Sequence, residues 1–175
     1  EENFVKHDPS QYFAAIIDNI EILQHPCILH TQEIVARYLN VPTRNIAVKV
    51  FQDKATGVKG GERHYGDIAA IKAQTANGSI HQAAVKSLVA LQTIIITENP
   101  PLTRILYTIR EKPKKLSYVI TLRAIQTRDF LTASVAEIPW TTLSETAQKI
   151  LEACPNASSV YYDVTPKPPA TVEME

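Results

Sequence analysis

The sequence has little cysteine, no excess charge of either sign and no long apolar run. Its two cysteines, Cys27 and Cys154, form no CxxC pair or Cys/His cluster, so we expect no metal or redox site and a reducing cytoplasmic setting. The 18 basic and 18 acidic residues cancel, which removes the electrostatic signature of a nucleic-acid binder. No apolar run approaches the roughly 18 residues of a membrane span, so we predict no membrane partner.

Glycine is also scarce, and it is concentrated in one place. Four of the five glycines fall within Thr56–Gly66, which we call the glycine hairpin. Glycine permits positive φ and close backbone approach, so a special turn with a functional role is predicted there. Neither GxxxxGK[ST] nor GxGxxG occurs, so no ATP or dinucleotide loop is indicated.

The overall composition is that of an ordinary globular protein. The chain has 175 residues, of which 45% are hydrophobic and 21% charged, enough for one domain or two small ones. It begins at Glu1 rather than methionine, so we expect a piece of a longer or processed protein.

The first 40 residues are predicted to form a helical N-terminal element. Asp8-Pro9 is a good helix start, and apolar residues at spacings of three and four continue from Phe13 to Leu23. Pro26 would end this helix, and a second helix is expected over 31–39.

The rest of the chain reads as strands and helices in alternation. Thr142-Leu143-Ser144-Glu145 fits a capping box and predicts a helix that ends near Cys154. A further helix is predicted over 80–96, although its β-branched end, 93–97, fits a strand equally well. The expected strands are 46–51, 67–73, 102–109, 116–127 and 159–164.

An internal repeat organises these elements. Ile105-Leu106-Tyr107 precedes Val160-Tyr161-Tyr162 by 55 residues, and the same offset places Lys112-Pro113 on Lys167-Pro168. We therefore predict an α+β fold of two related strand–helix–strand units, with helices on one face of the sheet. The expected divisions are 1–40 (helical element), 41–115 (first unit) and 116–175 (second unit). An apolar open sheet face would call for a second copy of the chain.

The C-terminal tail, residues 166–175, is unusual. It begins Pro166-Lys167-Pro168-Pro169, whose prolines exclude a helix and hold the lysine extended. From composition alone, a disordered end and a segment that folds over a ligand are equally good interpretations.

The tail sequence, Pro166-Lys167-Pro168-Pro169-Ala170-Thr171-Val172-Glu173-Met174-Glu175, closely resembles the ending of the glutamine-hydrolysing GMP synthase family. Two further blocks resemble that family in the same order: Gly57-Val58 with Gly60, Arg63 and Tyr65, and then 119–125 with 129–133. The extra unit at 74–116 is similar to the longer type with two C-terminal subdomains.

The resemblance implies a role in making GMP from XMP, ATP and glutamine. It implies the C-terminal domain, which dimerises and helps to bind XMP, without the glutaminase or ATP-pyrophosphatase domain, so the chain alone would be inactive. ATP and Mg²⁺ would belong to the parent enzyme, and this chain would carry no cofactor. The expected partners are a second copy, XMP and the ATP-pyrophosphatase domain.

The resemblance also assigns candidate XMP ligands and no catalytic residue. Lys167 would contact the phosphate and Glu173 the purine N–H groups, with Thr171 shaping the tail and Arg63 contributing from the glycine hairpin. Without the family, Lys167 and Arg63 would be read as solvated surface residues.

Other polar residues have structural interpretations. Arg123 fits a core or dimer ion pair, with Asp129 as a partner, at least as well as a ligand contact. Tyr65 is expected to pack, Lys112 to be solvated and His64 to lie at the surface. His25 and His30 are expected to be structural.

Three departures from the family pattern bear on XMP binding. Gly61 stands in place of an aspartate, Pro166 in place of a small hydroxyl residue and Met174 in place of a tryptophan. Two rival functions therefore stay open: a free-standing nucleotide-binding or regulatory protein, and a purely structural oligomerisation module.

Overall fold

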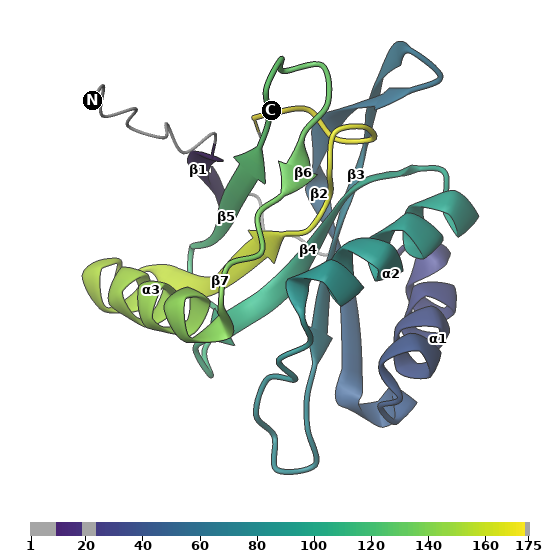
Figure 1. Cartoon of the computed structure of the whole chain (residues 1–175). Helices are drawn as coiled ribbons and strands as arrows, with labels where there is room; N and C mark the ends of the chain where they lie inside the picture. The colour runs from purple at the N-terminus through teal and green to yellow at the C-terminus, as the bar shows by residue number, and fades with distance from the viewer. Residues whose placement is uncertain (1–9, 19–23, 174–175) are drawn as a thin grey trace, which may run out of the picture.

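The computed structural model describes residues 10–18 and 24–173, and within them three helices lie against one seven-stranded sheet (Figure 1). A 3₁₀ turn, Thr43–Asn45, leads into the second strand. The helices are α1 (Cys27–Leu39), α2 (Val85–Glu98) and α3 (Trp140–Ala153). The strands are β1 (Ser10–Ile17), β2 (Ile46–Lys59), β3 (Glu62–Ala73), β4 (Leu102–Glu111), β5 (Tyr118–Gln126), β6 (Ser134–Val135) and β7 (Ala157–Asp163).

The sheet has the order β1-β5-β7-β4-β3-β2, with the short β6 paired to β5. Each strand–helix–strand unit, β3-α2-β4 and β5-α3-β7, brings its two strands together in parallel. The two units meet where β4 and β7 pair antiparallel at the centre, and β2 and β1 add an antiparallel strand at either end. The predicted α+β fold of two related units is therefore confirmed.

The internal repeat seen in the sequence is also present in the structure, where equivalent elements of the two units match at a fixed offset. Helices α2 and α3 are both 14 residues long and start at Val85 and Trp140, an offset of 55 residues. Tyr107 and Tyr162, also 55 residues apart, lie directly opposite each other across the β4–β7 pair. Their hydroxyls donate to the carbonyls of His81 and Ala136, again at this offset. The two units are thus related by a pseudo-twofold axis at this tyrosine pair.

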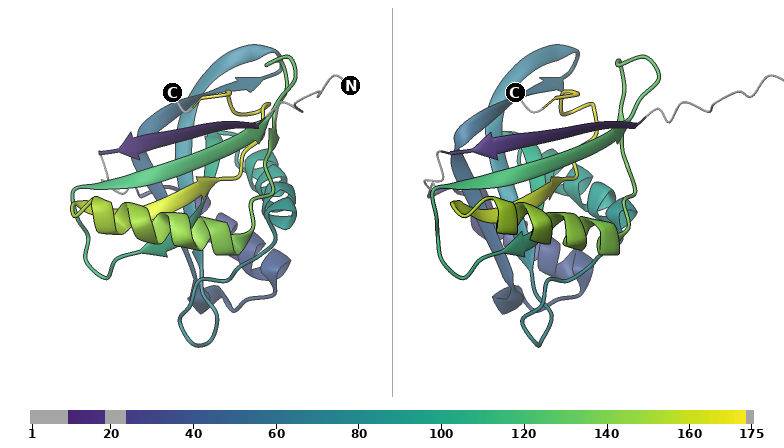
Figure 2. Two further views of the ribbon diagram at one scale, coloured as in Figure 1. Left: turned by 60° about the vertical axis from the view of Figure 1, so that its left-hand side comes forward. Right: turned by 90° about the vertical axis from the view of Figure 1, so that its left-hand side faces the viewer.

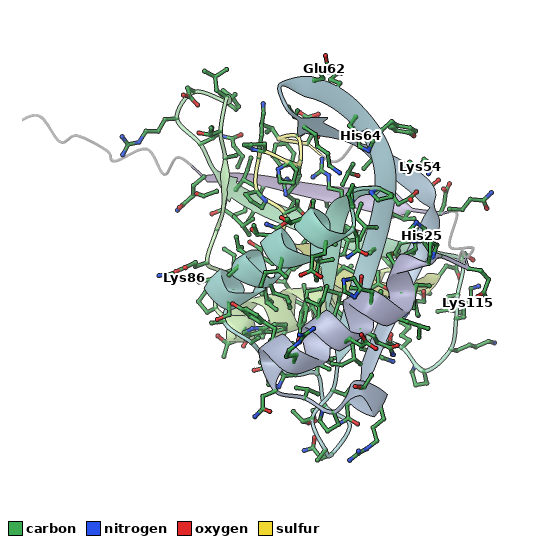
Figure 3. The ribbon with its side chains drawn as sticks, turned by 90° about the vertical axis from the view of Figure 1, so that its right-hand side faces the viewer. His25, Lys54, Glu62, His64, Lys86 and Lys115 are labelled. Atoms are coloured by element: carbon green, nitrogen blue, oxygen red, sulfur yellow. The ribbon has the colours of Figure 1, made fainter. Side chains whose placement is uncertain are left out.

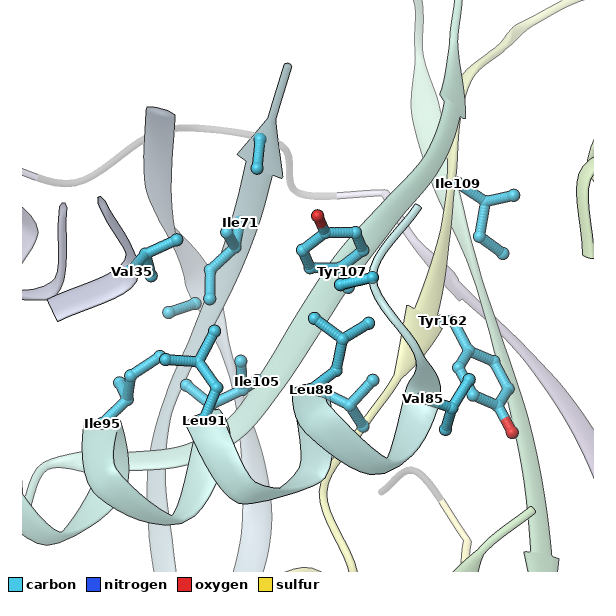
Figure 4. Packing of buried hydrophobic residues seen from close by; sticks show 14 of the residues in the cluster. Val35, Ile71, Val85, Leu88, Leu91, Ile95, Ile105, Tyr107, Ile109 and Tyr162 are labelled. Atoms are coloured by element: carbon cyan, nitrogen blue, oxygen red, sulfur yellow. The ribbon is translucent and has the colours of Figure 1, made fainter. Parts of the chain in front are cut away.

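All three helices pack on the same face of the sheet, as predicted (Figure 2). Figure 4 shows Leu88, Leu91 and Ile95 of α2 turned toward Ile105 and Tyr107 of β4. Their helical spacing explains why the β-branched end of α2 stays helical up to Glu98: a strand would place half of these apolar side chains on the solvent side.

The opposite sheet face is apolar too, but the chain covers it. Its cluster includes Phe51, Leu106 and Tyr161, each at most 2% exposed. Burial raises the pKa of the Tyr161 hydroxyl to about 12. The sheet is strongly twisted, so its two ends curve over this face (Figure 2). The open apolar face anticipated from the sequence is therefore already filled within one chain.

The helix predicted from Phe13 onward is wrong for the described residues 10–17, which form β1. This strand pairs with β5 from Ser10 opposite Gln126 to Ile17 opposite Val119. The apolar residues fit alternation as well as helical spacing, because Phe13, Ala15 and Ile17 are less exposed than the residues between them. Pairing with the edge of β5 decides between the two. Residues 1–9 and 19–23, which carry the rest of that prediction, lie outside the described part.

The capping box predicted at Thr142 is also wrong. Helix α3 begins at Trp140, after Pro139, and no side chain caps its first turn, so Thr142 lies within the helix. The other helices and strands occur where predicted, with boundaries shifted by a few residues or, for β2, extended by eight. The division of the chain at 40 and 115 stays a prediction.

Candidate functional site

The C-terminal tail is held against the fold at a sharp corner. The Lys167–Pro168 and Pro168–Pro169 peptide bonds are cis. Lys167 pairs with Ala133 in both directions, with N–H to carbonyl distances of 2.9 and 3.0 Å. The ammonium of Lys167 donates to the carbonyl of Phe130, at the tip of the β5–β6 loop (residues 127–133). The interpretation as a disordered end is therefore wrong for residues 166–173, and the segment that folds over a ligand stays a prediction.

The glycine hairpin supports the tail from the other side. Its β2–β3 turn consists of Gly60 and Gly61, both with positive φ, as a tight two-residue hairpin requires. Below the turn, the Val58 N–H donates to the Pro169 carbonyl at 2.6 Å. A Cβ on Gly57 would lie 2.7 Å from the same oxygen, so only glycine allows this approach. The predicted close backbone contact at the glycine hairpin is thus made with the tail.

Two buried arginines lie under the tail and share one carboxylate. Arg104 and Arg123 contact the same oxygen of Asp163 at 2.8 and 3.1 Å, and all three side chains are at most 1% exposed. We call this group the arginine clamp. Burial lowers the pKa of Arg123, and Asp163 opposes that effect. Because arginine stays protonated in proteins, the clamp carries one more positive than negative charge.

The clamp also donates to the tail. Arg123 donates to the main-chain carbonyls of Thr165, Thr171 and Val172 at 2.6–2.8 Å. Arg104 donates to the Thr171 hydroxyl and the Glu173 carbonyl at 2.5 and 2.6 Å. The tail main chain is therefore fixed by charge-assisted bonds on both sides of the proline corner.

The structure gathers three of the four predicted site residues on one segment. Lys167, Thr171 and Glu173 all lie on the clamped tail, and the Glu173 side chain is exposed. Arg63 is exposed on β3, directly opposite Val58 of β2. Since Val58 is the residue that contacts the tail, Arg63 is separated from it by the width of β2.

Expectations about three neighbouring residues are corrected by the structure. The core ion pair expected for Arg123 is present, but its partner is Asp163 rather than Asp129, because a strand side chain at this position points into the sheet layer under the tail. Tyr65 is 66% exposed and does not pack. The ammonium of Lys112 is not left to solvent, because it donates to the carbonyls of Cys154 and Pro155 at the end of α3.

Sequence reasoning missed Arg104 and Asp163. Arg104 stands within a largely apolar strand, Leu102–Ile109, and Asp163 within another, which is the signal that could have identified them. A charged side chain between buried strand residues is itself buried, and a buried charge needs a hydrogen-bonded group of opposite charge.

Two hollows flank the tail corner, and Pro166 lines both. One, of about 560 Å³, lies against the β5–β6 loop and includes Arg128, Asp129 and Ser134. The other, of about 490 Å³, lies between the glycine hairpin and α2, with Pro168 and Pro169 on its wall. Each is large enough for part of a small-molecule ligand.

A second charged cluster lies near the base of the glycine hairpin. Asp67 accepts from Lys54 and from His25 Nε2, the latter at 3.0 Å. Both donors are labelled in Figure 3. The Cys27 N–H donates to His25 Nδ1, so Nε2 carries the hydrogen. His30 pairs with Glu98, so both histidines have the structural role expected. Within the described ranges, no three His, Cys, Asp or Glu side chains are arranged to hold a metal ion. No helix in them is long and apolar enough to cross a membrane.

Comparison with known proteins gives a consistent result. Residues 114–174 match the family model of the GMP synthase C terminal domain. Over its full length the chain is 33% identical to a subunit of the glutamine-hydrolyzing GMP synthase of Sulfurisphaera tokodaii, of which it covers 40%. It is 38% identical over 126 residues to the corresponding subunit from Saccharolobus solfataricus, which is 72% of this chain and 31% of that protein. The chain thus spans less than half the length of these relatives.

Proposed function

The chain belongs to the family of the GMP synthase C-terminal domain, in its longer form with two related units, and on that premise we propose that it is the XMP-binding and dimerisation domain of a GMP synthase. The parent protein would convert XMP, ATP and glutamine to GMP. The chain would contribute to this reaction without carrying a catalytic residue, and ATP and Mg²⁺ would bind in the rest of the parent.

The observation that carries the proposal is the clamped tail corner. Lys167 and Glu173 lie six positions apart on a segment whose main chain is bonded to the β5–β6 loop, the glycine hairpin and the arginine clamp. Chain ends ordinarily fray unless they are tied down, and this support on three sides holds Lys167 and the Glu173 main chain in a fixed relation to each other.

The proposed roles follow from the chemistry of each side chain. The Lys167 ammonium suits a phosphate because it is a compact charge with three donors, and it would exchange its bond to the Phe130 carbonyl for the ligand. The Glu173 carboxylate is exposed and could accept from purine N–H groups. Arg63 would reach the nucleotide from the glycine hairpin. Thr171 would act through the tail conformation, since its hydroxyl is already bonded to Arg104.

Dimerisation is proposed through β1 rather than through a sheet face. β1 lies at the end of the described sheet order and exposes Tyr12 and Ile16 at 66% and 64%. An apolar hollow of about 390 Å³ lies beside it, lined by Phe13, Leu122 and Leu143 among others. Exposed apolar surface on an edge strand suits a second copy of the same chain.

The test is calorimetric titration of the 175-residue chain with XMP. We expect Lys167→Ala to weaken XMP binding about 10-fold or more, the value of one charge-assisted bond. Lys114→Ala, an exposed lysine of the 111–115 turn, is the matched control and should bind like the wild type. Equal binding by both variants would contradict the assignment, and tight binding of GMP instead of XMP would favour a regulatory protein.

A further inference from the structure

The arginine clamp donates to three main-chain carbonyls and one side-chain hydroxyl of the tail, and to the carbonyl of Thr165 directly before it. We propose that Arg104 and Arg123 are positioning residues, which hold the C-terminal tail in the one conformation that presents Lys167 and Glu173 to XMP. This inference rests on the proposed function. It adds two residues that never touch the nucleotide.

The bonding pattern spans the whole ligand-bearing segment. Arg123 binds the Thr165 carbonyl, just before the proline corner, and the Thr171 and Val172 carbonyls after it. Arg104 donates to the next carbonyl along the tail, that of Glu173, at 2.6 Å. A guanidinium can do this because its donors form a rigid planar fork, which a lysine ammonium cannot reproduce.

Asp163 supplies the negative charge that holds the guanidinium groups of Arg104 and Arg123 in place. Its Oδ2 accepts from Arg104 and forms an ion pair with Arg123 at 3.1 Å, and its Oδ1 accepts from the Thr165 N–H at 3.0 Å. Buried charges are expensive to desolvate, and an apolar core often serves stability equally well. The desolvation cost of these three buried charges is therefore better explained by the conformation that they impose on the tail than by a gain in the stability of the core.

The pseudo-twofold axis of the repeat relates the clamp to a second set of positions, which serves as a comparison. Strand register puts Lys72 where the second unit has Arg123, Ser159 where the first has Arg104, and Thr108 where the second has Asp163. Lys72 instead pairs with Glu111 at 2.6 Å, and Thr108 donates to the Ile71 carbonyl. The clamp takes Arg104 from the first unit and Arg123 and Asp163 from the second, and the three pseudo-symmetric positions do not form a second clamp.

Amide hydrogen exchange tests the clamp directly. The N–H groups of Val58, Lys167 and Ala170 all donate to tail or tail-contacting carbonyls, so they report on tail docking. In the 175-residue chain, Arg123→Lys should speed their exchange roughly 10- to 100-fold, the value of one or two charge-assisted bonds. The His81 N–H, bonded to Ala73 in the first unit, should not change.

XMP titration of the same variants links the clamp to the ligand. Arg123→Lys should weaken XMP binding by a similar factor, whereas Lys72→Gln, at the equivalent position of the first unit, should leave both exchange and binding as in the wild type. Thr171→Val keeps both arginines and removes one acceptor of Arg104. It should speed tail exchange about 5-fold even if the arginine variants fold poorly.

The outcomes separate the two proposals. Unchanged tail exchange in Arg123→Lys and Thr171→Val would overturn the clamp, whatever happens to XMP. Faster exchange with unaltered XMP affinity would also overturn it, because the tail conformation would then not matter for binding. A wild-type chain that does not bind XMP would overturn the proposed function, and the exchange data would still decide whether the arginines hold the tail.

Discussion

Asp67 is expected to make the region near the glycine hairpin sensitive to acid. Burial alone would raise its pKa, but hydrogen bonds from Lys54 and His25 outweigh burial and lower it from the usual 3.8. A lowered carboxyl pKa means that the folded state binds the proton less well than the unfolded state. The stabilisation is therefore complete above about pH 4 and is lost as the pH falls through the lowered pKa.

Thermal unfolding of Asp67→Asn across the acidic range checks this assignment. The variant should be less stable at neutral pH, by about 1–3 kcal/mol for the lost buried partner, and should lose less stability than the wild type between pH 5 and pH 2. Asp53→Asn, a half-exposed aspartate of the same strand as Lys54, is the control. Parallel pH curves for Asp67→Asn and the wild type would contradict the assignment.

Gly61 offers a test of the ligand site at a single position. Its φ is +81°, and nothing lies within 4 Å of the Cβ that another residue would add. Gly61→Asp should therefore cost only about 1 kcal/mol of backbone strain, while it restores the carboxylate that the family resemblance places there. If the tail corner binds XMP, the Gly61→Asp variant should bind XMP more tightly than the wild type in calorimetric titration. Gly78→Asp, also at positive φ with open space but in the first unit, should leave affinity unchanged.

The sequence pointed to the proposed XMP ligands but not to the residues that support the tail beneath them. The tail motif pointed to Lys167 and Glu173, and glycine concentration pointed to the hairpin. Arg104 and Asp163 could not be found in this way, because their role depends on two strands, β4 and β7, that are neighbours only in the folded sheet. The same reason made Asp129 the wrong partner for Arg123.

The glycine hairpin and the tail form one unit at the level of elements. Gly57→Ala would place a methyl group 2.7 Å from the Pro169 carbonyl, which is closer than van der Waals contact allows. Because the hindering atom is backbone, the tail itself must move, at about 1–3 kcal/mol of overpacking strain. We expect faster exchange at the Val58 N–H and weaker XMP binding.

Gly78→Ala serves as the control for that change. It introduces strain from positive φ but meets no neighbouring atom, so it should lower thermal stability without an effect on the tail. If Gly57→Ala also lowers only thermal stability, without faster exchange at Val58 or weaker XMP binding, the close contact with the tail does not contribute to XMP binding.

Element prediction succeeded where the periodic signal was long. Helix α2 and strands β4, β5 and β7 have buried faces that span many residues, so local pattern and fold agree. It failed for β1, where eight residues fit both periods and the choice depends on the free edge of β5. The cap of α3 failed because the Thr-x-x-Glu pattern occurs inside a helix that Pro139 had already started.

The whole molecule is expected to associate through β1. Ile16→Asp places a charge on the exposed side of this edge strand and should convert the proposed dimer to a monomer in size-exclusion chromatography with light scattering. Leu29→Asp, an equally exposed apolar position on α1, should leave the mass unchanged. A wild-type chain that is monomeric at all concentrations tested would contradict the dimer.

The central β4–β7 pair has a consequence for how the two halves respond to dilution. An interface between separate molecules is populated according to their concentration, whereas two units on one chain are linked and meet at a fixed effective concentration. The Tyr107–Tyr162 pair therefore persists in a nanomolar solution as well as in a concentrated one. Units joined in one chain can also differ in sequence, and here Arg104 of the first unit and Arg123 and Asp163 of the second form a clamp on one side of the pseudo-twofold axis only.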